Sequence, residues 1–201
     1  RIEDNAFANL SNLRDVLLSS NHLQKFNSGA FTHTPKLVNL NVDRNRIKSL
    51  QEKFLAFLES NNTLLILDFQ RNNITDISEK AFDGIADGFA DISLDLSRNF
   101  IEILPPALFN YSYHFFSIFL HVNPIKKIPG LLCDEKCDIG YFAIDCDRID
   151  LETMKNMVQW ALKYNIFLNA ANCPQYDNVT CALNGSCSKS GKIYNIGFVF
   201  I

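Results

Sequence analysis

The chain is poor in the residues that build catalytic, metal and phosphate sites. Its eight glycines do not cluster, so it has no glycine-rich phosphate loop. Its four histidines, at positions 22, 33, 114 and 121, are scattered, and none stands at ligand spacing with a carboxylate or cysteine. A serine–histidine–aspartate set could be drawn from any sequence with these counts and carries no weight. We therefore expect no enzyme, no metal and no cofactor, because function must be argued from a site.

Runs of positive charge and long apolar runs are also missing. The net charge is −3 and lysine and arginine never cluster, which disfavours nucleic acid as a partner. The apolar tail, residues 193–201 (IYNIGFVFI), is nine residues long, whereas a spanning helix needs about 20. This tail is expected to be either a last strand or the start of a membrane anchor, and both possibilities stay open.

What the chain does have is a ladder of apolar residues that recurs five times around the asparagines Asn21, Asn45, Asn72, Asn99 and Asn123. Apolar residues stand five and three positions before each asparagine, and two and five positions after it. In a chain with 47% apolar residues, twenty apolar residues at these twenty positions have a chance probability on the order of 10⁻⁷. A period of 24 or 27 residues predicts a solenoid with one parallel sheet. The strands should be centred near residues 16–18, 40–42, 67–69, 94–96 and 118–120.

The ladder asparagines should face inward and bond backbone groups of the adjacent turn that would otherwise be buried without a partner. A phenylalanine recurs at the nineteenth position of several units, at Phe7, Phe31, Phe82 and Phe109, while the second unit offers Phe54 and Phe57 instead. These rings are expected to be core residues.

The pattern L-x-x-L-x-L-x-x-N-x-L resembles the extracellular leucine-rich repeat family in its 24-residue form. The resemblance covers residues 1 to about 129 and implies an α/β solenoid, a horseshoe with a concave parallel sheet. Two units are 27 residues long, and the fourth opens on Asp91, where an apolar residue is expected. The chain also starts inside a repeat, so we expect the parent protein to continue upstream with further repeats.

The domain organisation follows from the repeats. Residues 1–130 should hold one partial unit and five units, residues 131–187 a cysteine-rich C-terminal cap, and residues 188–201 the apolar tail. The cap resembles that of extracellular leucine-rich repeat proteins in Asn123–Pro124, Cys146, Trp160 and Cys173–Pro174. It departs from the family in reading Ile144-Asp145-Cys146 where a Cys-x-Cys is usual.

An amphipathic helix is predicted inside the cap, between Asp150 and Tyr164. Its apolar residues recur at three- and four-residue steps: Leu151, Met154, Met157, Val158, Ala161 and Leu162. Asp150 is the expected N-cap. This helix would close the open end of the apolar core.

Two features indicate an oxidising, secretory compartment. Six cysteines are confined to the end of the chain, at Cys133, Cys137, Cys146, Cys173, Cys181 and Cys187, and an even number of this kind favours a disulfide framework. Spacing does not choose among their 15 pairings. Six glycosylation sequons begin at Asn9, Asn61, Asn73, Asn110, Asn178 and Asn184, where chance predicts about two. We expect an extracellular or cell-surface glycoprotein.

The candidate binding residues lie between the core positions of each strand, on the concave face. They are Asp43, Arg44, Asp68, Gln70, Arg71, Asp95, Arg98, Phe119 and His121. Arg44, Arg71 and Arg98 occupy equivalent positions and should form an exposed row. The face is either a solvated surface whose charges neutralise one another, or a polar recognition strip bracketed by exposed Leu17, Ile66 and Phe119.

These observations favour a non-catalytic protein-binding module. The resemblance implies part of a cell-surface receptor ectodomain that binds a protein ligand or co-receptor and serves signal transduction at a membrane. The alternative is a structural matrix or cell-adhesion protein that self-associates. Nothing in the sequence names the ligand.

Overall fold

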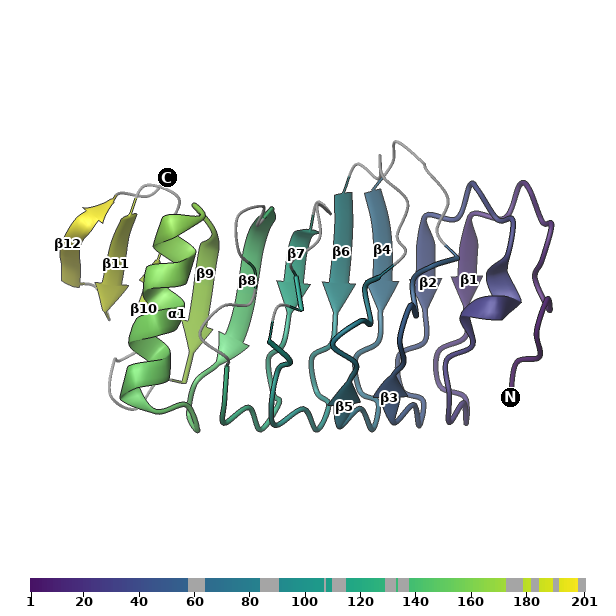
Figure 1. Ribbon diagram of the computed structural model, residues 1–201, viewed down its shortest axis with the longest axis horizontal. Helices are drawn as coiled ribbons and strands as arrows, with labels where there is room; N and C mark the ends of the chain where they lie inside the picture. Colours follow the sequence, from purple (N-terminus) through teal and green to yellow (C-terminus); the bar gives the residue numbers. More distant parts are fainter. Residues whose placement is uncertain are drawn as a thin grey trace.

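A computed structural model describes residues 1–57, 64–83, 91–106, 108–109, 115–128, 133 and 138–172, together with the backbone of residues 179–181, 185–189 and 192–198. Its strands stand side by side in one long row, with the N-terminus at one end and the C-terminus at the other (Figure 1). The row contains β1 (Asp15–Leu17), β2 (Asn39–Asn41), β4 (Leu64–Asp68), β6 (Asp91–Asp95), β7 (Phe115–Phe119), β8 (Ile139–Asp145), β9 (Phe167–Ala171), β10 (Val179–Cys181), β11 (Gly185–Lys189) and β12 (Lys192–Phe198).

The sheet confirms the repeat register. Every neighbouring pair from β1 to β9 is parallel, and the aligned residues include one continuous apolar row: Val16, Leu40, Leu67, Leu94, Ile118, Phe142 and Leu168. The first five of these are the residues that stand five positions before the ladder asparagines. On the return side, two short parallel strands form a second sheet, β3 (Ser49–Leu50) and β5 (Asp76–Ile77), and a 3₁₀ turn covers Ser28–Phe31.

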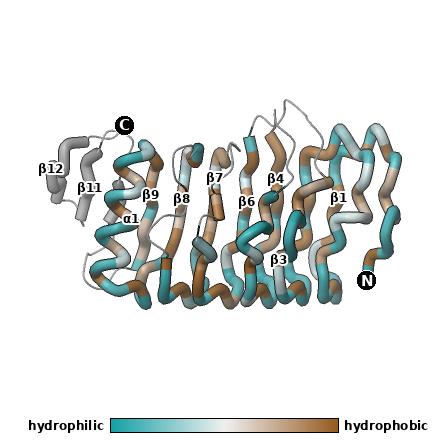
Figure 2. Tube along the Cα trace, viewed as in Figure 1, coloured by the Kyte–Doolittle hydropathy of each residue, from teal (hydrophilic) through white to brown (hydrophobic). Residues whose placement is uncertain are grey.

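The apolar ladder forms a continuous core behind the sheet. All its members are buried except Leu18, Phe26 and Ile128, which pack against the core while partly buried. Hydrophobic segments recur along the strands and the turns below them in Figure 2. Phenylalanine rings run through the core from repeat to repeat. Phe82, for example, lies 5.5 Å from Phe54 and 5.6 Å from Phe109 between ring centroids. These aromatics are core residues, as predicted.

The asparagine ladder satisfies the turns as expected. The Asn72 side chain donates to the Val42 and Phe69 carbonyl oxygens at 3.0 and 3.1 Å, and its own oxygen accepts from the Ile47 N–H at 3.0 Å. Asn45, Asn99 and Asn123 repeat this pattern. Asn21, beside the edge strand β1, is exposed and bonds only the Leu18 and Ser19 carbonyl oxygens of its own turn.

The residue before each ladder asparagine turns the chain out of the strand. Ser20, Arg44, Arg71, Arg98 and Val122 all have left-handed backbone conformations, with φ between 50° and 58°. This conformation is uncommon outside glycine, and least favourable for a β-branched residue such as Val122. The repeat geometry therefore fixes where the arginine row stands, at the end of the strands.

The region expected as a cap contributes strands as well as a helix. Both β8 and β9 continue the parallel sheet of the repeats, and β10, β11 and β12 follow in antiparallel order. Helix α1 (Leu151–Lys163) lies in front of β9 in Figure 1. Asp150 is its N-cap and accepts from the Thr153 N–H at 2.7 Å, as predicted.

The helix buries Met154, Met157, Trp160 and Ala161 against the core. Trp160 packs edge-on against Phe142, with ring centroids 5.4 Å apart. Leu151, which the sequence placed on the apolar face, is 40% exposed. That assignment is wrong, because the first turn of the helix extends past the core.

The apolar tail contributes β12, so residues 192–198 form a strand. In the part of the chain that the structure describes, no helix is long and apolar enough to cross a membrane.

Candidate ligand-binding face

The outward side chains of β1, β2, β4, β6 and β7, together with the residues that follow each strand up to its ladder asparagine, form the sheet face. Register sets their neighbours: Asn41 is paired with Asp68, Asp68 with Asp95, and Asp95 with Phe119. Leu17 and Ile66 are 69% and 45% exposed. The structure thus brings the predicted binding residues onto one surface.

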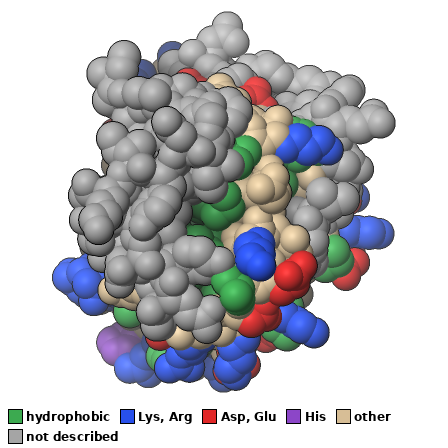
Figure 3. All heavy atoms as spheres, turned by 90° about the vertical axis from the view of Figure 1, so that its left-hand side faces the viewer, with side chains coloured by type: hydrophobic (Ala, Val, Ile, Leu, Met, Phe, Trp, Pro, Cys, Tyr) green, Lys and Arg blue, Asp and Glu red, His purple; other side chains and the backbone are tan. Residues whose placement is uncertain are grey.

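Arg44, Arg71 and Arg98 form the predicted row, but their environments differ. The backbone N–H groups of these residues donate in turn to Gln70, Ser97 and His121 carbonyl oxygens of the next repeat. Arg44 and Arg98 are exposed, whereas the Arg71 side chain is only 37% exposed. The sequence-based expectation of a freely exposed Arg71 is therefore wrong, because its guanidinium is drawn back onto the sheet. The strands run downward in Figure 1, and in the end-on view lysine and arginine side chains gather mostly along the lower rim (Figure 3).

Asp43 organises this part of the row. Its carboxylate lies 3.3 Å from Arg71 Nη1 and 3.4 Å from Arg44 Nη1, and its side chain is only 8% exposed. Arg71 Nη1 also donates to Gln70 Oε1 at 2.9 Å. Asp43 and Gln70 therefore hold the arginine in place. They are less accessible to a ligand than the sequence suggested, because both lie beneath or beside that guanidinium.

Asp68 and Asp95 form an acidic pair on adjacent strands. Burial raises the pKa of Asp68; hydrogen bonds from Gln70 oppose this shift, and the charges of Asp95 and Asp43 add to it. Asp95 accepts from the Ser97 N–H and hydroxyl at 2.8 and 2.6 Å. No lysine or arginine within the described ranges forms an ion pair with either carboxylate.

Phe119 and His121 close the predicted set at the end of β7. His121 Nδ1 lies 3.3 Å from an oxygen of Asp145, whose other oxygen accepts from the Val122 N–H at 2.6 Å. The Phe119 ring lies 5.5 Å from the Tyr141 ring, which stacks on Phe167 at 5.1 Å. Sequence reasoning missed Tyr141 and Phe167 because it ended the sheet at the last ladder asparagine. The apolar Phe142, 24 residues after Ile118, was a signal that could have found them.

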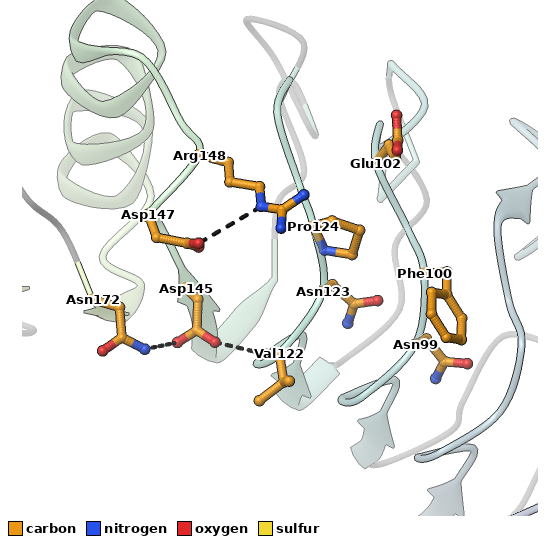
Figure 4. A pocket seen from close by; sticks show the side chains of 10 residues that line it. All are labelled: Asn99, Phe100, Glu102, Val122, Asn123, Pro124, Asp145, Asp147, Arg148 and Asn172. Atoms are coloured by element: carbon orange, nitrogen blue, oxygen red, sulfur yellow. Dashed lines mark hydrogen bonds and ion pairs between the residues drawn. The ribbon is translucent and has the colours of Figure 1, made fainter.

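A groove of about 700 Å³ lies beyond the ends of β6, β7 and β8. Figure 4 shows Asp145 between Asn172 and Val122, with Arg148 and Asp147 on one side and Phe100 and Glu102 on the other. Phe100 and Val122 are 56% and 54% exposed. The sequence did not predict this groove, which depends on how consecutive turns stack.

Two of the six sequons fall on described residues, and both asparagines, Asn9 and Asn73, are exposed. Asn61, Asn110, Asn178 and Asn184 lie outside the described residues. Cys133 and Cys146 are buried and disulfide-bonded. The side chains of Cys137, Cys173, Cys181 and Cys187 also lie outside the described part, so the pairing pattern stays a prediction.

Chemically, the sheet face offers charge, hydrogen bonds and aromatic surface. Within the described residues, no group of three or more histidine, cysteine, aspartate or glutamate side chains could hold a metal ion. The arrangement of its charges and rings suits reversible recognition of another molecule.

Comparison with known proteins supports the repeat assignment. Residues 1–47 and 35–87 match the leucine rich repeat family. The chain is also 29% identical over 129 residues to Toll-like receptor 3 of Boselaphus tragocamelus. That alignment covers 64% of this chain and 14% of the receptor, so the chain spans a small part of the receptor's length. Both similarities fit the solenoid and are consistent with a protein-binding module of receptor type.

Proposed function

We propose that this chain is a non-catalytic, extracellular protein-binding module from the ectodomain of a cell-surface receptor. The sheet face carries the proposal, because the solenoid gathers side chains from successive repeats into one extended surface. Arg98 and Phe119 are its accessible ligand contacts. Arg44 and Arg71 add positive charge, while Asp43 and Gln70 hold Arg71 in place.

The extracellular location rests on the sequons and cysteines. Exposed Asn9 and Asn73 can accept glycans, and an even set of cysteines suits an oxidising compartment. Similarity to a Toll-like receptor supports the receptor context over a matrix role. The partner is a protein ligand or co-receptor.

The test uses the full ectodomain to capture secreted or cell-surface partners, followed by binding kinetics with variants of the sheet face. Arg98→Glu should slow association and steepen or invert its salt dependence, since interface charges mainly set encounter rates. Phe119→Ala should raise the dissociation rate if the ring anchors the partner. Lys48→Glu, an exposed charge reversal on the return side, is the matched control and should bind normally.

Normal binding by Arg98→Glu and Phe119→Ala, combined with loss of binding in return-side variants, would place the interface elsewhere. The matrix or adhesion alternative predicts self-association instead. Concentration-dependent dimerisation in sedimentation velocity, abolished by the same sheet-face variants, would favour it over a receptor role.

A further inference from the structure

Two carboxylates and two aromatic rings lie next to one another on the sheet face. Asp68 pairs with Asp95, and Asp95 with Phe119, on three successive strands. Neighbouring strands are about 4.8 Å apart, so these side chains form a short, continuous line. The Tyr141 ring adjoins Phe119 at 5.5 Å. We call Asp68, Asp95, Phe119 and Tyr141 the acidic–aromatic strip.

The two carboxylates are held by neutral donors. Asp68 accepts from the side-chain amides of Asn41 and Gln70, both at 3.1 Å, and from the Gln70 N–H at 3.1 Å. Asp95 accepts only from Ser97. Like charges directly opposite each other on neighbouring strands are unfavourable. The negative charge of the strip is therefore oriented but not neutralised by any described lysine or arginine.

The nearby arginines do not supply the missing cation. Arg44 and Arg71 both lie on Asp43. Arg98 comes three residues after Asp95, beyond the end of β6, and forms no ion pair with it. The face thus separates its charges into an acidic line on the strands and a basic line at their ends.

The aromatic part of the strip is positioned to contact a cation that sits on the acids. Phe119 and Tyr141 are both half-buried, and their rings are tilted by 45° to one another. The Tyr141 hydroxyl accepts from the Asn169 amide at 2.7 Å, which fixes the ring. A guanidinium can pair with a carboxylate while its plane contacts an aromatic ring, a combination that an ammonium group performs less well.

We propose that the acidic–aromatic strip docks a segment of a protein ligand through an arginine side chain, with the guanidinium on Asp95 and Asp68 and its flank against Phe119. This inference rests on the proposed function and specifies the partner's chemistry. Charge complementarity chooses the occupant: an anionic segment would meet the two carboxylates, and an apolar one would leave them desolvated without a counter-ion.

The test is a titration of the isotope-labelled protein with three matched peptides, followed by amide chemical shifts. The probe is Ac-Gly-Ser-Gly-Arg-Gly-Ser-Gly-NH2, and the comparison peptides carry citrulline or glutamate in place of arginine. Citrulline keeps the shape of arginine but removes its charge. We expect saturable shifts in β4, β6 and β7 with the arginine peptide alone, weakening as salt is raised.

Asp95→Asn should weaken the arginine peptide at least fivefold, and Phe119→Leu should also weaken it. Asn keeps the acceptor for Ser97, and Asp68→Asn is a second variant should the first be unstable. Asp15→Asn, an exposed carboxylate of the same face on β1, is the control and should bind like wild type.

Equal shifts with citrulline, wild-type affinity in both Asp variants, or spermidine binding as tightly as the peptide would each overturn the inference. The proposed function is judged separately. A captured protein ligand that is lost in Arg98→Glu but unaffected by Asp95→Asn leaves the sheet face as the binding site and removes only the arginine.

Discussion

Arg71 Nη1 lies 3.3 Å from Asp43 Oδ1, a contact that joins two successive repeats across the sheet face. Arg98 occupies the equivalent position one repeat later and has no such partner in the described residues. Residue 43 is aspartate, whereas the residue paired with it in the next repeat is Gln70. One side chain thus decides whether an arginine of the row supports the fold or stays available to a ligand.

Arg71→Ala should lower the free energy of unfolding by up to about 1 kcal/mol, the upper range for partly exposed ion pairs. Arg98→Ala should change it by less than about 0.5 kcal/mol. Both residues have left-handed backbones, with φ of 50° and 56°, so the comparison cancels the backbone effect. Denaturant unfolding measures the difference, and a larger loss in Arg98→Ala would contradict the ion-pair assignment.

Asn72→Ala should cost roughly 1–3 kcal/mol, because it leaves buried backbone groups at Val42, Phe69 and Ile47 without partners. Asn21→Ala is the matched control. Its asparagine is exposed and bonds only its own turn, so the melting temperature should fall much less. Comparable shifts for the two variants would refute the ladder argument.

Asp68 should make the fold more sensitive to pH than its asparagine variant. Its folded-state pKa lies above the usual 3.8, chiefly because of burial, so the folded state binds the proton more tightly than the unfolded chain. Stability from this group is gained as pH falls from its folded pKa towards 3.8, and lost as pH rises through the same window. The difference in unfolding free energy between wild type and Asp68→Asn should therefore shift towards wild type on acidification. An unchanged or opposite trend in denaturant unfolding across that range would contradict the raised pKa.

Gly140→Ala should destabilise the junction between β7 and β8 by about 1–3 kcal/mol. A Cβ atom at residue 140 would lie 2.9 Å from the Phe116 carbonyl oxygen, and backbone cannot give way easily. Gly29→Ala is the control, since its nearest neighbour is the Asp4 side chain at 3.2 Å. Thermal unfolding should show the larger loss for Gly140→Ala, and an equal loss would mean that the β7–β8 contact adjusts freely.

The six cysteines should all be paired in secreted protein, with at least one bond joining the stretch 133–146 to the stretch 173–187. A cross-link that closes a long loop typically stabilises by about 2–4 kcal/mol. Non-reducing peptide mapping by mass spectrometry identifies the bonds. Six free thiols or stoichiometric zinc would refute this framework.

Much of the fold was predictable because its signals are local and repeated. The asparagine positions set the register of Val16, Leu40, Leu67, Leu94 and Ile118, and the Asp150 cap set the start of α1. The prediction ended too early at the cap, where β8 and β9 keep the sheet but lose the ladder asparagine. A strand there is specified by packing against β7 rather than by the repeat motif.

By itself, the sequence determined the solenoid, its inward and outward faces and the arginine row, because a strand alternates its side chains and a repeat multiplies that signal. Only the tertiary structure decided which of these residues can meet a ligand. Asp43 is buried beneath Arg71, Asp68 and Asp95 oppose each other without a cation, and Tyr141 joins Phe119 from a strand outside the motif. These relationships depend on the distance and register between repeats, which the order of residues within one repeat does not contain.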